Sequence, residues 1–133
     1  MRELFDTELN VSDEPFTPER LADALGRAEV LAPTITDHLD AEMLANAGPK
    51  LKLIANYGAG VDHIDVPAAI DRGLIVTNTP GVLTEDTADL TLALIMAVAR
   101  RIVEGANVVQ GGQFKGWTPT WMLGRRLTGK RTA

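Results

Sequence analysis

The sequence contains no cysteine, and only 5% of its residues are aromatic. Without thiols the chain can form neither a disulfide nor a thiolate metal site, and this composition suits a reducing compartment. We therefore expect a cytoplasmic protein with no metal site. Of the two histidines, His38 lies among polar residues, and the sequence identifies no acid or nucleophile as its catalytic partner, so we expect a surface side chain.

Long apolar runs are also missing. The longest one, Leu90 to Ala99, is about half a membrane span and contains Thr91. Met1-Arg2-Glu3 leads into mixed polar sequence and not into the apolar core of a signal peptide. We expect no membrane partner and no secretion.

Positive charge is scarce in most of the chain. Residues 1–99 hold 6 Lys/Arg against 17 Asp/Glu, a net charge of −11, whereas residues 100–133 hold 7 against 1, a net charge of +6. A body this acidic repels phosphate, and the basic charges of the tail are few and scattered. We therefore expect no nucleic-acid partner, and we expect the tail to pack against an acidic protein surface.

The buried, Val/Ile-rich strand that normally opens an α/β domain is missing from residues 1–10, where only Thr7–Asn10 suggests a short strand. Helix and strand signals alternate after that point. Thr17, Asp40 and Asp65 are each placed to cap a helix, and Glu29–Ala32, Leu51–Ala55 and Leu74–Thr77 have strand-like composition. We expect Leu74–Thr77 to be covered on both faces, Ala68, Ala69 and Ile70 to point inward, and Gly73 to end the third helix.

The second half of the chain begins with a long helix of unusual composition. It runs from about Glu85 to Arg101, and between Leu90 and Ala99 it has almost no polar face, so it needs cover on most sides. We expect a break near Gly105. An aromatic arm, Phe114–Met122, follows without any regular period and is typical of an interface.

The most informative stretch is the turn that follows the apolar run Leu51–Ala55. Gly58 and Gly60 stand one residue apart in it, and glycine lets a backbone turn sharply and approach a ligand. Free N–H groups on such a turn favour an anion, which predicts a small-anion cradle at Tyr57–Val61. A dinucleotide fingerprint, G-x-G-x-x-G, fails because its third position is His63, whereas a tight turn without a ligand stays open as an alternative.

Three ordered motifs resemble the NAD(P)-dependent D-2-hydroxyacid dehydrogenases: Asn56-Tyr57-Gly58-Ala59-Gly60-Val61-Asp62-His63-Ile64-Asp65, Asn78-Thr79-Pro80-Gly81 and Thr84-Glu85-Asp86-Thr87-Ala88-Asp89. Gly116-Trp117 and Trp121-Met122-Leu123-Gly124 are most similar to the glyoxylate/hydroxypyruvate reductase branch. The resemblance covers nearly the whole chain. It implies an α/β fold with an incomplete flavodoxin-like parallel sheet, followed by a long helix and an extended arm.

The resemblance also implies roles for individual residues. It makes residues 1–83 a partial substrate-binding domain and residues 84–133 a helix and interface arm that lead to an absent Rossmann domain. The substrate carboxylate would bind the turn of Tyr57, Gly58, Ala59 and Gly60, and the cofactor would contact Thr87 and also Thr79. Trp117 and Trp121 would lie at a dimer interface, where Trp121 would reach a neighbouring subunit's active site.

The departures from the family pattern decide the expected activity. The glycine fingerprint of the cofactor domain and the family's catalytic arginine, glutamate and histidine have no counterpart in these 133 residues. We therefore expect a truncated enzyme that has no catalytic residue, binds neither NAD nor NADP by itself and is inactive. Its partners would be a small 2-oxo or 2-hydroxy acid and a second copy in a homodimer, in which domain swapping could fill the open sheet position. The alternative is a non-catalytic oligomerising or binding module derived from this family.

Overall fold

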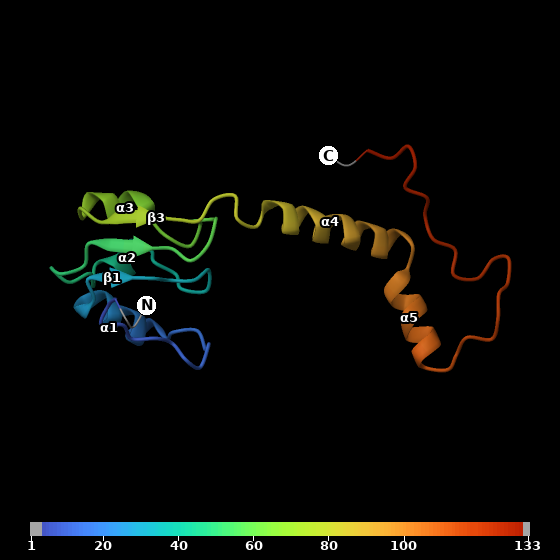
Figure 1. Cartoon of the computed structure of the whole chain (residues 1–133), viewed down its shortest axis with the longest axis horizontal. Coiled ribbons are helices and arrows are strands. Elements are labelled where there is room, and N and C mark those ends of the chain that lie inside the picture. Colours follow the sequence, from blue (N-terminus) through green and yellow to red (C-terminus); the bar gives the residue numbers. More distant parts are fainter. Residues whose placement is uncertain (1–3, 132–133) are drawn as a thin grey trace. The chain divides into compact units, whose positions relative to one another are not determined.

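The computed structural model describes residues 4–131, and the chain divides into two compact units, Met1–Val82 and Leu83–Ala133. The first unit holds a parallel sheet in the order β1-β2-β3, with β1 at Val30–Leu31, β2 at Leu53–Ala55 and β3 at Ile75–Thr77. Helices α1 (Pro18–Arg27), α2 (Ala41–Leu44) and α3 (Val66–Asp71) alternate with these strands (Figure 1). This order is typical of α/β domains built from βαβ units.

The three helices of the first unit begin where the sequence predicts. In each case the side chain before the helix accepts a hydrogen bond from an N–H of the first turn, which has no partner inside the helix. The pairs are Thr17 Oγ1 with Arg20 N (3.3 Å), Asp40 Oδ1 with Met43 N (2.7 Å) and Asp65 Oδ1 with Ala68 N (3.0 Å). Gly73 has a φ of +75° and ends the α3 segment, which confirms the predicted left-handed residue.

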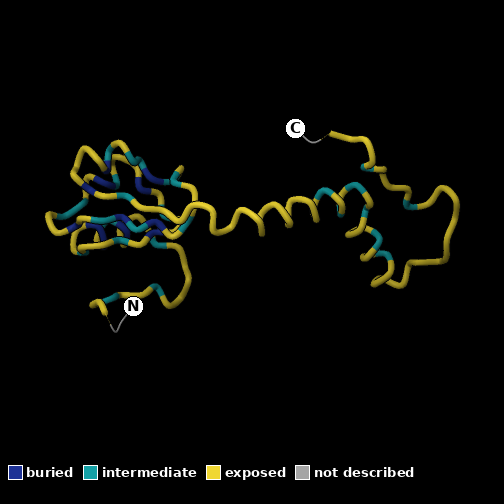
Figure 2. The backbone as a smooth tube through the Cα atoms, turned by 45° about the horizontal axis from the view of Figure 1, so that its top comes forward, coloured by how far each residue is buried: buried dark blue, intermediate teal, exposed yellow. Residues whose placement is uncertain are grey.

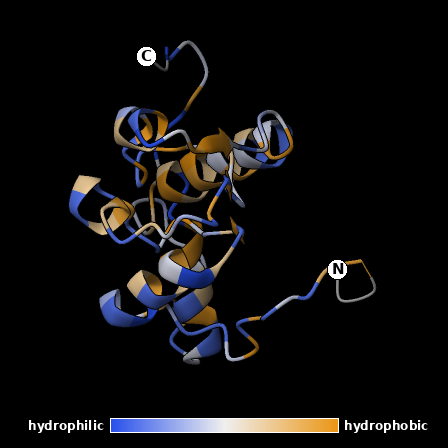
Figure 3. Ribbon diagram, turned by 90° about the vertical axis from the view of Figure 1, so that its left-hand side faces the viewer, coloured by the Kyte–Doolittle hydropathy of each residue, from blue (hydrophilic) through white to orange (hydrophobic). Residues whose placement is uncertain are grey.

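One apolar core holds the first unit together. It gathers residues from all three helices, from β2 and from the connecting loops, and its members are Leu21, Leu25, Leu39, Leu44, Leu51, Ile54, Ile64, Ala69 and Leu74. Their segments are the dark blue parts of the tube in Figure 2. Helix α1 shows how the helices contribute, because Leu21, Ala24 and Leu25 are buried on one side while its charged residues face water (Figure 3).

The described sheet is covered on one face only. Leu31, Ile54 and Val76 are neighbours in register, and they contact or belong to the core. Side chains alternate along a strand, so Val30 and Ile75 belong to the opposite face, where they are 52% and 62% exposed. The expectation that Leu74–Thr77 is covered on both faces is therefore wrong.

Two smaller expectations are also wrong. Ile70 is 61% exposed, because α3 is short and presents Val66, Ala68 and Ala69 to the core instead. Thr7–Asn10 forms no strand in the described structure. A strand needs a partner for its backbone groups, and composition alone does not supply one.

The second unit consists of α4 (Thr84–Ala99), α5 (Ile102–Gln110) and a segment from residue 111 to 131 that has neither helix nor strand. The helices separate at Arg101, whose φ is +54°, and Gly105 lies inside α5, so the predicted break at Gly105 is wrong. A tertiary contact supports the observed break, since Arg125 N donates to Ala99 O over 2.7 Å. A hydrogen bond from Arg101 also lowers the pKa of the Glu104 carboxyl.

The second unit has no core of its own among the described residues. Neither α4 nor α5 contains a buried residue. Five large apolar side chains of α4 are 49% to 78% exposed: Leu90, Leu92, Leu94, Met96 and Val98. In the arm, the rings of Phe114 and Trp121 lie 5.6 Å apart. None of the described helices has the length and apolar character that a membrane crossing requires.

We expect Ile54→Ala to lower the free energy of unfolding of the first unit by about 2–5 kcal/mol, because it leaves a cavity in the core beneath β2. The matched control is Ile75→Ala, which removes the same side chain from the exposed face of β3. We expect the control to cost less than about 1 kcal/mol. Urea unfolding followed by circular dichroism measures both, and equal losses would contradict the one-sided core.

Candidate functional site

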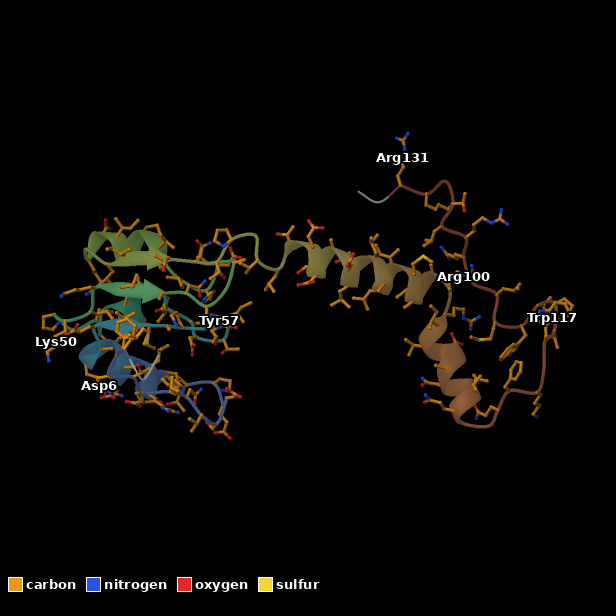
Figure 4. All side chains as sticks on the ribbon, in the orientation of Figure 1. Asp6, Lys50, Tyr57, Arg100, Trp117 and Arg131 are labelled. Carbon is orange, nitrogen blue, oxygen red and sulfur yellow. The ribbon has the colours of Figure 1, made fainter. Side chains whose placement is uncertain are left out.

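The turn Tyr57–Val61 lies at the carboxyl end of β2, the central strand of the sheet. It is fixed to the segments on either side, since Asn56 N donates to Thr77 O and Tyr57 N donates to Pro33 O, each over 2.9 Å. Figure 4 shows Tyr57 at the end of the sheet toward which the strands run. Ligands of open parallel sheets bind at this end, so the turn is correctly placed for a binding site.

Three successive carbonyl oxygens of the turn accept hydrogen bonds from asparagine side chains and from the backbone. Asn56 Nδ2 donates to Gly58 O (3.1 Å) and to Gly60 O (2.8 Å), and Asn78 Nδ2 donates to Ala59 O (2.7 Å). Thr79 N also donates to Gly58 O, over 3.0 Å. Each of these three carbonyl groups therefore already has a hydrogen-bond donor from within the protein.

The opposite side of the turn presents N–H groups. The peptide bonds of the described chain are all trans, so the N–H of each residue points away from the carbonyl of the residue before it. The carbonyls of Gly58, Ala59 and Gly60 face the donors from Asn56, Asn78 and Thr79. The N–H groups of the residues that follow them, Ala59, Gly60 and Val61, therefore point away from these donors. None of these three N–H groups donates a hydrogen bond to another described residue. Anion-binding concavities in proteins are built from successive free N–H groups, so the anion cradle at this turn stays a prediction.

The two glycines have a different role from the one expected. Neither Gly58 nor Gly60 has a positive φ, and an added Cβ would meet its nearest atom at 3.5 Å or 3.7 Å, which is ordinary contact. The turn therefore does not require glycine for its conformation or its packing, and that part of the expectation is wrong. The other part of the expectation, that the glycines let a ligand approach the backbone, stays a prediction.

The local electrostatics of the turn come from the backbone. Residues 56–64 contain no lysine or arginine, so these nine residues offer an anion free backbone N–H groups and no Lys or Arg side chain. One carboxylate lies nearby, because Asp62 Oδ2 is 3.7 Å from the position of a Cβ on Gly60. This charge disfavours an anion at the turn.

The two histidines occupy different surroundings. His63 is partly buried and its Nε2 lies 3.0 Å from Asn56 Oδ1, as befits a histidine of the turn. His38 is exposed, as expected. The helix that follows the turn starts only at Val66, whereas a dinucleotide fingerprint leads directly into its helix, and this argues against that alternative.

The other predicted site residues fall in both units. Thr79 is exposed and its N–H joins it to the turn, while Thr87 lies on α4 in the second unit. Trp117 and Trp121 belong to the arm of the second unit, where they are 80% and 41% exposed. Figure 4 labels Trp117 in this arm. In the part of the chain that the structure describes, no three His, Cys, Asp or Glu side chains gather as a metal site would need.

Sequence reasoning did not assign a role to Asn56 or Asn78, which hold the carbonyls of the turn. A signal for them exists, since each stands directly after a strand, Asn56 after β2 and Asn78 after β3. Strands that end side by side bring such residues together, and an amide side chain can donate to a nearby carbonyl.

Comparisons with known proteins identify the family of this chain. The family model described as "D-isomer specific 2-hydroxyacid dehydrogenase, catalytic domain" matches residues 1–124. A glyoxylate reductase from Thermococcus litoralis is 47% identical in an alignment of 129 positions that covers 92% of this chain and 39% of that enzyme. The chain thus spans about two fifths of the length of the curated relatives it matches.

Solved structures give the same result. A protein from Polaromonas sp. JS6 66 is 40% identical with a TM-score of 0.82, over 96% of this chain and 40% of that one. The D-lactate dehydrogenase from Aquifex aeolicus, solved with NAD and lactic acid, is 29% identical with a TM-score of 0.71, over 95% of this chain and 37% of its own. The expectation of a flavodoxin-like α/β fold is confirmed, and the chain belongs to the family of D-isomer specific 2-hydroxyacid dehydrogenases.

Proposed function

We propose that this chain carries the substrate-binding part of an NAD(P)-dependent D-2-hydroxyacid dehydrogenase. The parent reaction is hydride transfer from a nicotinamide cofactor to a small 2-oxo acid such as glyoxylate or hydroxypyruvate. The observation that supports this proposal is the row of free N–H groups at Ala59, Gly60 and Val61, at the carboxyl end of the central strand. The Thermococcus litoralis relative, a glyoxylate reductase, supports the choice of substrate class.

In this proposal the substrate carboxylate binds the turn Tyr57–Gly60, chiefly through the N–H groups of Ala59 and Gly60. A hydrogen bond to a charged group contributes about 1.5–3 kcal/mol, so two of them bind a carboxylate only weakly. Such weak binding is sufficient to orient a small acid with its carboxylate on the turn and its 2-oxo group directed elsewhere.

The proposed reaction needs groups that these 133 residues do not supply. The nicotinamide cofactor provides the hydride, and a proton donor must serve the oxygen of the 2-oxo group. The sequence holds no G-x-G-x-x-G for the cofactor pyrophosphate. His63 hydrogen-bonds with Asn56 and His38 is exposed, and neither matches the family's catalytic histidine motif. We therefore propose that the chain by itself is inactive and holds no NAD or NADP.

The remaining roles are proposed by analogy with the family. Residues 1–83 form the partial substrate-binding domain, and residues 84–133 form a helix and arm that serve a homodimer interface through Trp117 and Trp121. Thr87 and Thr79 contact the cofactor when the cofactor domain is present. The absence of cysteine supports a cytoplasmic location.

A second candidate function is a non-catalytic module that assembles with another copy of the chain. It is favoured by α4, whose large apolar side chains are not buried within the second unit. Large apolar side chains that lie exposed together on a protein surface normally mark an interface. The two candidates are compatible, because the first concerns what the turn binds and the second concerns how the chain assembles. Light scattering at micromolar concentration tests the second, and a monomer would count against it.

We expect acetate and glyoxylate to shift the backbone amide signals of Ala59, Gly60 and Val61 in a ¹⁵N-resolved NMR titration of the chain. In Gly60→Ala the added methyl group crowds these N–H groups, so we expect affinity to fall about tenfold, as loss of one hydrogen bond to a charged group would cause. Stability should be unchanged or about 0.4–1 kcal/mol higher, because the backbone conformation suits alanine. Unshifted amides in the unaltered chain would contradict the anion cradle.

We expect Asp62→Asn to strengthen glyoxylate binding about two- to fivefold at low salt. Two charges about 4 Å apart in water interact by about 1 kcal/mol, and the substitution removes such a repulsion. The gain should shrink as salt is added, because exposed charges are screened. The matched control is Asp71→Asn at the end of α3, which should leave the affinity unchanged.

We expect no oxidation of NADH or NADPH by the purified chain with glyoxylate or hydroxypyruvate. The positive control is a full-length relative assayed in the same way. Turnover above the blank, in a sample whose intact mass shows only this chain, would overturn the proposal that the chain is inactive.

A further inference from the structure

Asn56 is the one buried polar residue in the described part of the chain, with 3% of its surface exposed. Its side chain lies behind the turn and joins three groups: the carbonyls of Gly58 and Gly60, and Nε2 of His63. No buried side-chain nitrogen or oxygen among the described residues lacks a partner, so this small network is complete. Buried and fully satisfied networks fix a local conformation.

The chemistry of the network determines which atom of each side chain faces which partner. Carbonyl oxygens only accept hydrogen bonds, so the amide nitrogen of Asn56 must face Gly58 O and Gly60 O. Its oxygen, Oδ1, then faces His63 Nε2 at 3.0 Å and can only accept. His63 Nε2 must therefore carry a hydrogen, which assigns the tautomer of this histidine from the hydrogen-bond pattern.

We propose that Asn56 and His63 act together as the positioning pair for the anion-binding turn, a proposal that rests on the proposed function of that turn. The Nε2–H of His63 holds the amide of Asn56 in one orientation. The amide then holds the carbonyls of Gly58 and Gly60, and the trans peptide geometry turns the N–H groups of Ala59 and Val61 away from Asn56. These two N–H groups flank that of Gly60, whose preceding carbonyl is held by Asn78. Both residues act through the backbone and touch no reacting atom.

The alternative orientation of the amide shows why His63 is needed. If Asn56 turned over, Oδ1 would face two carbonyl oxygens, and three acceptors would then stand together without a hydrogen. His63 favours the observed orientation because its Nε2–H needs an acceptor on that side. Removing this donor leaves Oδ1 without a partner in a buried place, which is unfavourable and loosens the turn.

The test compares His63→Gln with His63→Leu in the full chain. The amide nitrogen of glutamine can reach a position close to that of Nε2 and can donate, whereas leucine fills the space without a donor. In ¹⁵N NMR of the ligand-free chain, we expect His63→Leu to move the amide signals of Ala59, Gly60 and Val61 and His63→Gln to leave them near their original positions. Glyoxylate affinity should fall about tenfold in His63→Leu and less than about threefold in His63→Gln.

Two further measurements keep the proposal testable if the leucine variant fails to fold. The imidazole ¹⁵N shifts of His63 should show a hydrogen on Nε2, and a neutral ring with its hydrogen on Nδ1 would overturn the assignment. Asn56→Asp, which replaces the donor by an acceptor of the same shape, should shift the three amides and weaken glyoxylate binding at least as much as His63→Leu does. Leucine and glutamine variants with equal amide shifts would likewise overturn the proposal.

The measurements separate this inference from the proposed function. If the unaltered chain binds neither acetate nor glyoxylate, the function proposed for the turn fails. The ligand-free amide shifts and the tautomer of His63 still decide whether the pair positions the turn.

Discussion

The burial of one face of β2 is the interaction on which the rest of the first unit depends. Ile54 is fully buried between Leu31 and Val76 of the neighbouring strands, over a core supplied by three helices. This burial fixes where β2 ends, and therefore where Asn56 enters the interior. A polar side chain in that place must find partners, and the partners it finds are carbonyls of its own turn. The candidate site is thus a consequence of how the strand is anchored.

The site performs its proposed role without charged side chains. Its binding groups are backbone N–H groups, which remain fixed because the carbonyls behind them are occupied by Asn56, Asn78 and Thr79. Donors that are fixed before the ligand arrives lose little freedom on binding. A fixed row of N–H groups suits a small carboxylate, which is the group shared by all 2-oxo acids. The specificity for one particular acid must therefore come from other parts of an enzyme of this family.

The two units contrast in how much they stabilise themselves. The first has a continuous core, whereas the second has an apolar α4 with no buried residue among those described. A helix that is apolar on nearly all sides gains stability mainly from tertiary cover and not from propensity. The region matched in the curated relatives is about two fifths of their length. The second unit therefore lacks tertiary cover among the described residues, and this observation motivates the interface role proposed for it.

The sequence by itself determined the features that depend on neighbours along the chain. Thr17, Asp40 and Asp65 cap their helices as predicted, Gly73 adopts the left-handed conformation, and the ordered motifs around Asn56 and Asn78 identify the family. Capping and turn chemistry act over three or four residues, so local spacing is sufficient to predict them.

Only the tertiary structure decided the features that join distant residues. The single covered face of the sheet depends on which helices pack against it, and the break at Arg101 accompanies a contact from Arg125, 24 residues further along. The direction of the N–H groups at the turn depends on donors from Asn56, Asn78 and Thr79, which two different strands bring to one place. Residue spacing along the chain carries no information about such encounters, because they follow from the packing of the sheet as a whole.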